Sequence, residues 1–139
     1  HEFASEKILV FYEHWKKQRL RETFTFEESE DFFLFCLRNL KSQCIKQVYV
    51  VIDGKLVGFA WGIAYKSGNW IGLHLKVDYS IKGLSRFLHQ ERAKLFADLD
   101  LFTLGTGAHE KGIDSYKQEL GPVIEKKYYY VLTGNIPKN

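Results

Sequence analysis

Residues 70–122 decide the fold, and they read WIGLHLKVDYSIKGLSRFLHQERAKLFADLDLFTLGTGAHEKGIDSYKQELGP. Apolar and polar residues alternate in the first part of this stretch, which is typical of a strand with one buried face. The apolar side consists of Ile71, Leu73, Leu75 and Val77, and the other side of Trp70, Gly72, His74, Lys76 and Asp78. We therefore expect a strand that presents polar side chains to a cleft or to water.

A helix and a second strand follow. From Ile81 onward, apolar residues recur at helical spacing, at Ile81, Leu84, Leu88 and Leu95. The apolar run from Leu101 to Leu104 predicts another strand, so that the three elements form a βαβ unit with a right-handed connection. The helix then begins, at residues 80–84, beside the C-terminal end of the first strand. Exposed N–H groups at such a helix start favour a phosphate or a carboxylate.

Two amphipathic helices are expected near the N-terminus. Residues 5–20 place Ile8, Phe11, Tyr12 and Trp15 on one stripe of a helix. Thr25 and Glu28 have the spacing of a capping box and predict the start of the next helix.

A hairpin follows the helices. Asp53-Gly54 is a strong turn signal between two β-rich runs, residues 48–52 and 55–65. In the second run one face is bulky (Val57, Phe59, Trp61, Ile63 and Tyr65) and the other is nearly bare (Leu56, Gly58, Ala60, Gly62 and Ala64). The bare face predicts that a helix or a ligand approaches the backbone closely, and its glycines predict a bulge. Residues 123–132 are expected to form the last strand.

The composition is that of an ordinary folded domain. The chain has 139 residues, of which 45% are hydrophobic and 16% aromatic, so it can bury a core. A net charge of +3 does not indicate a nucleic-acid binder, although it leaves room for a local basic patch. We expect a single domain over residues 4–134, cut from a longer protein, with residues 1–3 left over from cloning and residues 135–139 as a tail.

Cys36 and Cys44 are expected to be free thiols in a reducing compartment. No apolar run reaches membrane-spanning length. Free thiols in a reducing compartment favour a location in the cytoplasm or at the cytoplasmic face of a membrane. No group of His, Cys and Asp residues has the spacing of metal ligands, so no metal is expected.

The order of these elements resembles the core of the GNAT N-acyltransferases. That resemblance implies an α/β fold: a mixed sheet with an antiparallel meander, then a βαβ unit, with helices on both faces. Residues 48–132 resemble the GNAT-like domain at the C-terminus of phosphatidylglycerol lysyltransferases. The matching pieces are Asp78 at a strand end, Leu104-Gly105 after the next strand, and GIDSYKQELGP at 112–122 before a tyrosine-rich strand. Members of that family carry pairs of GNAT repeats, and this chain has room for one.

The resemblance implies transfer of an aminoacyl group from aminoacyl-tRNA to a lipid hydroxyl or another small acceptor, with no further cofactor. Its partners would be the acceptor end of the tRNA and a second GNAT repeat, in the same chain or in a homodimer. The alternative is an N-acyltransferase that uses acetyl-CoA, whose pyrophosphate is gripped by an Arg/Gln-x-x-Gly-x-Gly/Ala loop. The corresponding bend, DYSIKGL at 78–84, keeps one glycine, which weakens the CoA interpretation. The third interpretation is a GNAT-like repeat without catalytic activity that binds or scaffolds a partner.

The candidate catalytic residues are Asp78, His74 and Lys117. Asp78 and His74 share a strand face, where either can orient the acceptor or take its proton. A hydrogen-bonded surface pair beside Lys76 accounts for them equally well. In the setting of the resemblance, Lys117 balances the charge of an aminoacyl-adenosine or a phosphate, and a solvated helix lysine is the alternative.

The expected donor-binding residues lie at the start of the crossover helix, in the loop after the next strand and on the last helix. They are Ser80, Lys82, Gly83, Gly105, Gly107 and Tyr116. Lys82 and Gly83 can meet a phosphate at the helix start. The loop glycines imply positive φ or a close backbone approach.

Overall fold

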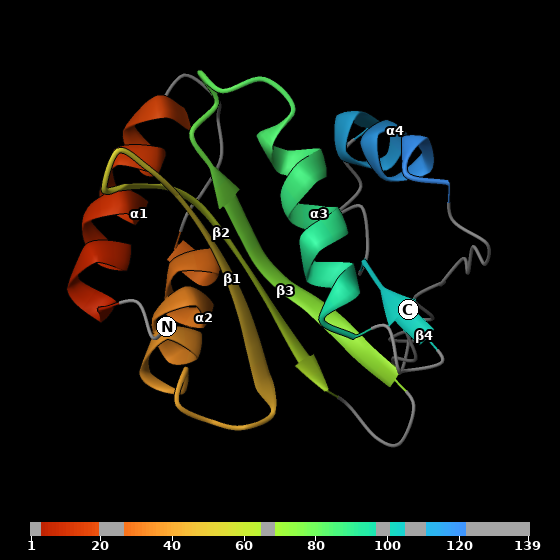
Figure 1. Ribbon diagram of the computed structural model, residues 1–139, viewed down its shortest axis with the longest axis horizontal. Helices are drawn as coiled ribbons and strands as arrows, with labels where there is room; N and C mark the ends of the chain where they lie inside the picture. The colour runs from red at the N-terminus through yellow and green to blue at the C-terminus, as the bar shows by residue number, and fades with distance from the viewer. Residues whose placement is uncertain (1–3, 20–26, 65–68, 97–100, 105–110, 122–139) are drawn as a thin grey trace, which may run out of the picture. The chain divides into compact units, whose positions relative to one another are not determined.

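Four strands form one sheet, and their order in the sheet is their order in the sequence (Figure 1). They are β1 (Ile45–Ile52), β2 (Lys55–Ala64), β3 (Asn69–Val77) and β4 (Leu101–Thr103). The pairs β1–β2 and β2–β3 are antiparallel, whereas β3 and β4 are parallel. The helices are α1 (Ser5–Arg19), α2 (Glu27–Arg38), α3 (Leu84–Lys94) and α4 (Lys111–Glu119). The predicted α/β fold, with a meander followed by a βαβ unit, is confirmed.

The computed structural model describes residues 4–19, 27–64, 69–96, 101–104 and 111–121. Residues 1–105 form one compact unit and residues 106–139 another. The sheet and helices α1 to α3 belong to the first unit, and α4 to the second. None of the described helices is long and apolar enough to cross a membrane.

The β1–β2 turn has the backbone that its sequence predicts. Asp53 and Gly54 have φ angles of 49° and 77°, so both lie in the left-handed region. Two-residue turns of this kind match the twist of the strands that they join.

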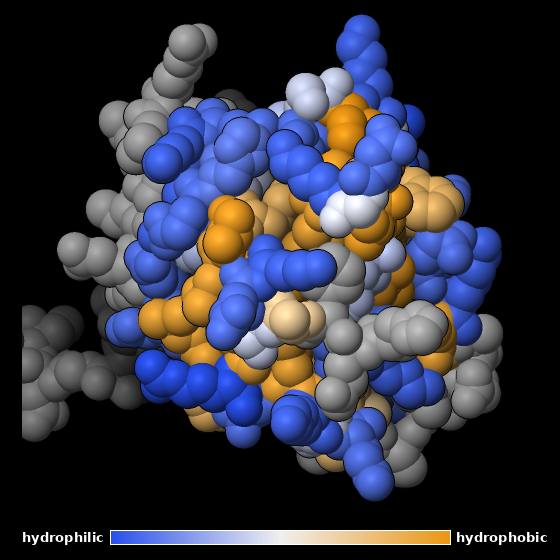
Figure 2. Space-filling model, turned by 60° about the vertical axis from the view of Figure 1, so that its left-hand side comes forward, coloured by the Kyte–Doolittle hydropathy of each residue, from blue (hydrophilic) through white to orange (hydrophobic). Residues whose placement is uncertain are grey.

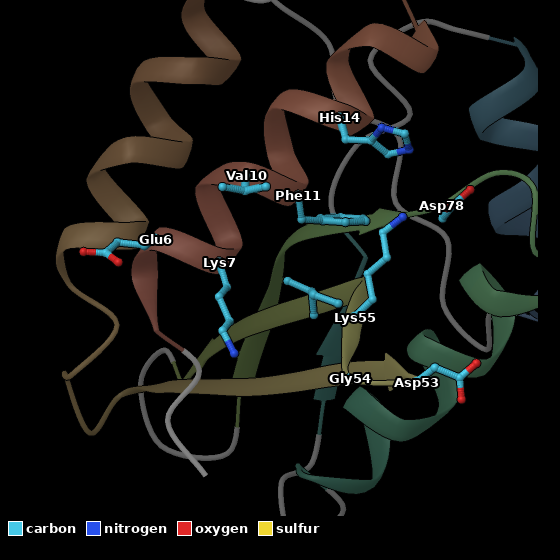
Figure 3. A pocket seen from close by; sticks show the side chains of 10 residues that line it. Glu6, Lys7, Val10, Phe11, His14, Asp53, Gly54, Lys55 and Asp78 are labelled. Atoms are coloured by element: carbon cyan, nitrogen blue, oxygen red, sulfur yellow. The ribbon is translucent and has the colours of Figure 1, made fainter.

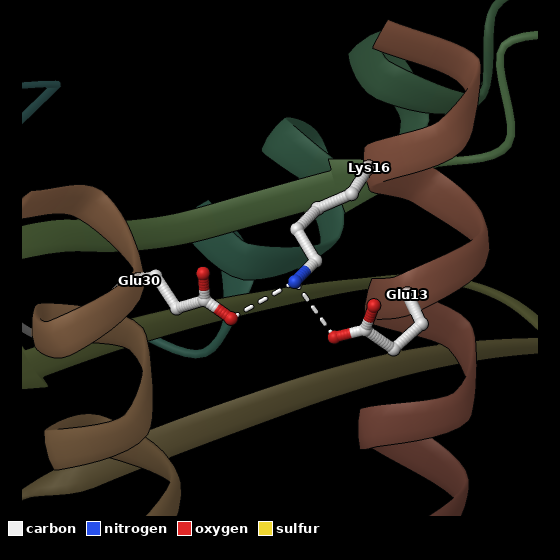
Figure 4. Close-up of polar contacts among 3 residues, drawn as sticks. All are labelled: Glu13, Lys16 and Glu30. Atoms are coloured by element: carbon white, nitrogen blue, oxygen red, sulfur yellow. Dashed lines mark hydrogen bonds and ion pairs between the residues drawn. The ribbon is translucent and has the colours of Figure 1, made fainter. Parts of the chain in front are cut away.

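Helices α1 and α2 cover one face of the sheet, here called the α1–α2 face, with an aromatic core (Figure 1). The Phe33 ring lies between two others, with its centroid 3.8 Å from that of Tyr12 and 5.5 Å from that of Trp61. Lys16 of α1 joins the two helices, since its Nζ lies 2.9 Å from Glu30 of α2 and 2.7 Å from Glu13 of α1 (Figure 4). The two helices therefore hold each other as well as the sheet.

Helix α3 covers the opposite face, here called the α3 face, by packing on the bare side of β2. A Cβ added at Gly58 would lie 2.9 Å from Leu88, and one at Gly62 would lie 2.9 Å from Phe96 and 2.7 Å from Trp70. Helix α3 thus makes the close approach that was predicted for the bare side of β2. Arg92 of α3 and Phe96, just after the helix, are buried, whereas Leu95, predicted to lie on the buried stripe, is 37% exposed.

Two bulges interrupt the predicted alternation. The first shifts the β1–β2 register between Val50 and Val51. As a result Val57 joins the core of the α3 face and Leu56 that of the α1–α2 face, the reverse of the predicted assignment. An inserted residue changes which face every following side chain occupies.

The second bulge lies between β2 and β3, beside Gly62, where a bulge was predicted. Ala60 pairs with Leu75 and Gly62 with Gly72, so that two residues of β3, 73 and 74, lie opposite Trp61 alone. The prediction that residues 70–78 alternate without interruption is therefore wrong. Trp70 stacks on Phe96 at 3.5 Å on the α3 face, whereas His74 contacts the rings of the α1–α2 face.

Candidate functional site

The bend between β3 and α3 is held by Asp78. Its Oδ1 accepts hydrogen bonds from Ser80 Oγ at 2.7 Å, from Ser80 N–H at 2.9 Å and from Gln18 Nε2 of α1 at 3.0 Å. These bonds, first those of Ser80 and then that of Gln18, lower the pKa of Asp78 from 3.8 to about 2. A carboxylate that is so firmly ionised is a weak base, and its geometry is that of a residue that fixes the bend.

After Asp78 the chain turns into α3 through Gly83, whose φ of 80° lies in the left-handed region. No side chain caps the helix. Ile81 N–H donates to Asp78 O at 3.1 Å. Lys82 and Gly83 are exposed, and no described residue accepts a hydrogen bond from their backbone N–H groups. This exposed helix start, with a lysine beside it, suits an anionic group.

Among the described strands, the sheet opens beside this bend. Strand β4 pairs with β3 only at residues 69–71, ending with the pair Ile71 and Thr103. Within the described residues, the rest of β3 from Gly72 onward has no strand on that side. The bulge at residues 73 and 74 therefore lies just beyond the part of β3 that pairs with β4.

Arg92 of α3, which was not among the predicted site residues, lies against this bulge. The side chain is 2% exposed, and its Nη1 donates to Trp61 O at 2.8 Å with a longer contact of 3.5 Å to Leu73 O. The signal that would have found it is spacing, because Leu84, Leu88 and Arg92 follow each other at four-residue intervals on the buried stripe.

His74 lies on the other face of the same bulge, and it is 8% exposed. The imidazole is packed among the rings of Phe32, Phe33 and Trp61, at centroid distances of 5.0, 5.7 and 6.0 Å. Burial, and secondarily the charge of Lys76, lowers the pKa of His74 from 6.5 to about 4. At neutral pH the ring is therefore uncharged, and no described residue bonds its buried Nε2.

His74 and Asp78 do not form a hydrogen-bonded surface pair, which was the alternative prediction for these residues. Asp78 is bonded to Ser80 and Gln18, while His74 lies in the aromatic core. The two residues still share the α1–α2 face, as predicted, since Lys76 between them lies over the Trp15 ring of α1 at 4.0 Å.

A pocket of about 620 Å³ adjoins the bend at Asp78. Its lining comes from α1, from the β1–β2 turn and from the end of β3: Glu6, Lys7, Val10, Phe11, His14, Asp53, Gly54, Lys55, Leu56 and Asp78. Figure 3 shows the Lys55 side chain running from the turn toward Asp78, past the Phe11 ring. The pocket is thus mixed in character, with an apolar wall and charged groups of both signs.

Hydrophobic side chains also remain exposed on the two N-terminal helices. Val10 is 72%, Phe35 60% and Phe32 48% exposed. Figure 2 shows hydrophobic patches between hydrophilic ones on the side that Figure 1 places at the left. Phe32 matters most for the site, because its partly exposed ring contacts the His74 imidazole.

The other residues that were predicted to belong to the site are not part of the bend or the bulge. Lys117 and Tyr116 belong to α4, in the second compact unit. Gly105 and Gly107 lie outside the described residues, as does the predicted last strand at 123–132. The roles assigned to these residues stay predictions.

The fold is shared with known acetyltransferases. The PaiA N-acetyltransferase of Thermoplasma acidophilum, solved in complex with coenzyme A, matches 89% of this chain and 86% of its own length, with a TM-score of 0.67 and 16% identity. A putative GNAT-family acetyltransferase of Desulfovibrio desulfuricans matches over 87% of this chain and 80% of its own length, with a TM-score of 0.66 and 17% identity. An aminoglycoside acetyltransferase from an uncultured soil metagenomic sample, in complex with trehalose, matches 94% of this chain and 93% of its own length, with a TM-score of 0.59 and 14% identity.

No protein-family model matches the sequence, and no curated protein is significantly similar to it. The similarity to phosphatidylglycerol lysyltransferases therefore stays a prediction. What the structural neighbours do establish is the architecture: this chain has the fold of the GNAT acetyltransferases.

Proposed function

We propose that this protein is an acyltransferase that takes an acyl group from a CoA thioester and passes it to an amine. The observation that carries the proposal is the exposed start of α3, with Lys82 and Gly83, at the open end of β3 in a GNAT fold. One neighbour of this fold is a complex with coenzyme A. Transfer from aminoacyl-tRNA and a repeat without catalytic activity stay predictions that no observation favours over this one.

The diphosphate of CoA would bind at the bend. The backbone N–H groups of Lys82 and Gly83, just before the first residue of α3, would donate to its anionic oxygens, and the Lys82 ammonium would add a positive charge. Asp78 keeps the bend in shape by its bonds to Ser80 and Gln18. The acyl end would then run along the open side of β3 toward the bulge.

The chemical step is attack of a neutral amine on the thioester carbonyl, with the CoA thiolate as leaving group. The amine nitrogen must lose a proton as the new C–N bond forms. His74 is our candidate acceptor for that proton, because its ring is uncharged at neutral pH and no described residue bonds its Nε2. Its lowered pKa makes it a weaker base than an exposed imidazole. The Phe32 ring contacts the imidazole at a centroid distance of 5.0 Å, so the acceptor would approach His74 beside this side chain. Asp78, with its pKa of about 2, acts as a positioning residue.

Titration calorimetry and thermal unfolding with CoA and acetyl-CoA test the proposal. A ligand that binds the folded state alone raises the unfolding midpoint as its concentration exceeds Kd. We expect Lys82→Ala to weaken CoA binding about five- to tenfold, as the loss of one phosphate contact worth roughly 1 kcal/mol. Lys41→Ala is the matched control, since Lys41 is an exposed lysine that precedes β1, at the other end of the sheet. Absence of CoA and acetyl-CoA binding by the unmodified protein would refute the proposal.

A further inference from the structure

A buried arginine stands where the sequence pattern of α3 calls for an apolar residue. Arg92 follows Leu84 and Leu88 at four-residue spacing and is the most buried charged residue among those the structure describes, at 2% exposure. A guanidinium stays protonated in proteins, so it must be compensated by hydrogen bonds rather than by neutralisation. Its placement therefore needs a local reason.

That reason is the bulge between β2 and β3. A bulge leaves backbone groups without their ladder partners. Arg92 Nη1 donates to Trp61 O, on the strand opposite the inserted residue, and approaches Leu73 O of the inserted pair. Its Nη2 lies 3.0 Å from His89 Nδ1, one turn earlier on α3. The guanidinium thus bonds one backbone carbonyl at the bulge, on β2, and approaches another, on β3.

Gly72 makes room for this arrangement. A Cβ at Gly72 would lie 2.8 Å from Arg92 Nη2 and 2.9 Å from its Cζ. The guanidinium therefore lies directly on the strand backbone, at the first β3 residue beyond its pairing with β4. The side chain and the bulge are fitted to each other beside the opening of the sheet.

Resting on the proposed function, we propose that Arg92 is a positioning residue that holds the bulge of β3 in the shape that receives the acyl group of the donor. The Leu73 carbonyl and the His74 N–H belong to one peptide group. A cation near that carbonyl polarises the whole peptide group and strengthens its N–H as a donor. Arg92 thereby sets the orientation of the His74 N–H at the bulge and its strength as a donor. The carbonyl oxygen of the acyl group is the acceptor that this N–H would bind.

The test compares the affinities for acetyl-CoA and for CoA, because the two ligands share the phosphates and differ in the acyl group. Arg92→Met removes the charge and the donors at similar length, and Arg38→Met, at an exposed arginine of α2, is the control. We expect the ratio of acetyl-CoA to CoA affinity to fall at least fivefold in Arg92→Met, with CoA affinity within twofold of the unmodified protein. Arg92→Lys should give an intermediate ratio. Backbone amide shifts of Leu73 and His74 should move in Arg92→Met.

Equal losses of affinity for both ligands, or an unchanged ratio, would overturn the positioning role while leaving CoA binding intact. If the unmodified protein binds no CoA, the proposed function fails first, and this inference falls with it. Should Arg92→Met fail to fold, Gly72→Ala decides the matter, since its methyl group displaces the guanidinium without removing it. The same drop in the affinity ratio is then expected, and an unchanged ratio overturns the proposal.

Discussion

Protonation of His74 should govern the acid stability of this protein. The pKa of His74 is lowered from 6.5 to about 4 by burial, so between these values the unfolded chain binds a proton that the folded protein excludes. Stability therefore falls as the pH falls through this window, and it is fully present above pH 6.5. A shift of this size corresponds to a loss of about 3 kcal/mol in the free energy of unfolding at full protonation.

Urea denaturation at a series of pH values between 4 and 8 measures this loss. His74→Leu removes the titrating group, so the difference in pH dependence between the two proteins isolates its contribution, whatever the variant's own stability. His14→Gln serves as the control, since His14 is exposed on α1. We expect the unmodified protein to lose about 3 kcal/mol more than His74→Leu between pH 7.5 and 4. Equal losses would show that the imidazole is accessible to protons in the folded state and would refute the buried arrangement.

Gly62→Ala should destabilise the protein by about 1–3 kcal/mol, because its methyl group meets the Phe96 ring in a packed interface; an unchanged urea midpoint would contradict that packing. Lys16→Met should cost about 1 kcal/mol at low salt and less at high salt, since Lys16 links α1 to Glu30 of α2; a loss independent of salt argues against the ion pair. Asp78→Asn should destabilise above pH 3.8, and the difference should vanish as the pH falls toward 2, where the carboxylate becomes protonated; a constant difference over this range would rule out the charge as its cause.

Periodicity predicted most of the elements of this fold, because helices and strands with one buried face leave a clear pattern. The α1 stripe, the Asp53-Gly54 turn and the change of period after β3 each correspond to an element found in the structure. The bare side of β2 correctly predicted a close approach. These features depend on neighbours in the sequence, where local rules apply.

The site was harder to predict, because its residues are brought together by packing. Asp78 was identified, but its partner Gln18 lies on α1, far away in the sequence. Arg92 was overlooked because a charged residue on a helix is normally assigned to the solvent side. Its spacing from Leu88 was the one sign to the contrary.

The bulge of β3 explains why the positions of His74 and Arg92 could not be predicted from alternation alone. Without the inserted residue, uninterrupted alternation would put His74 on the same face as Gly72, which is the face that the Arg92 guanidinium occupies. A cation so near would oppose protonation of the ring, and both groups would compete for one space. The bulge instead sends the imidazole to the α1–α2 face and leaves the guanidinium on the α3 face. One inserted residue thus separates the uncharged imidazole from the fixed charge of the guanidinium across a single layer of backbone.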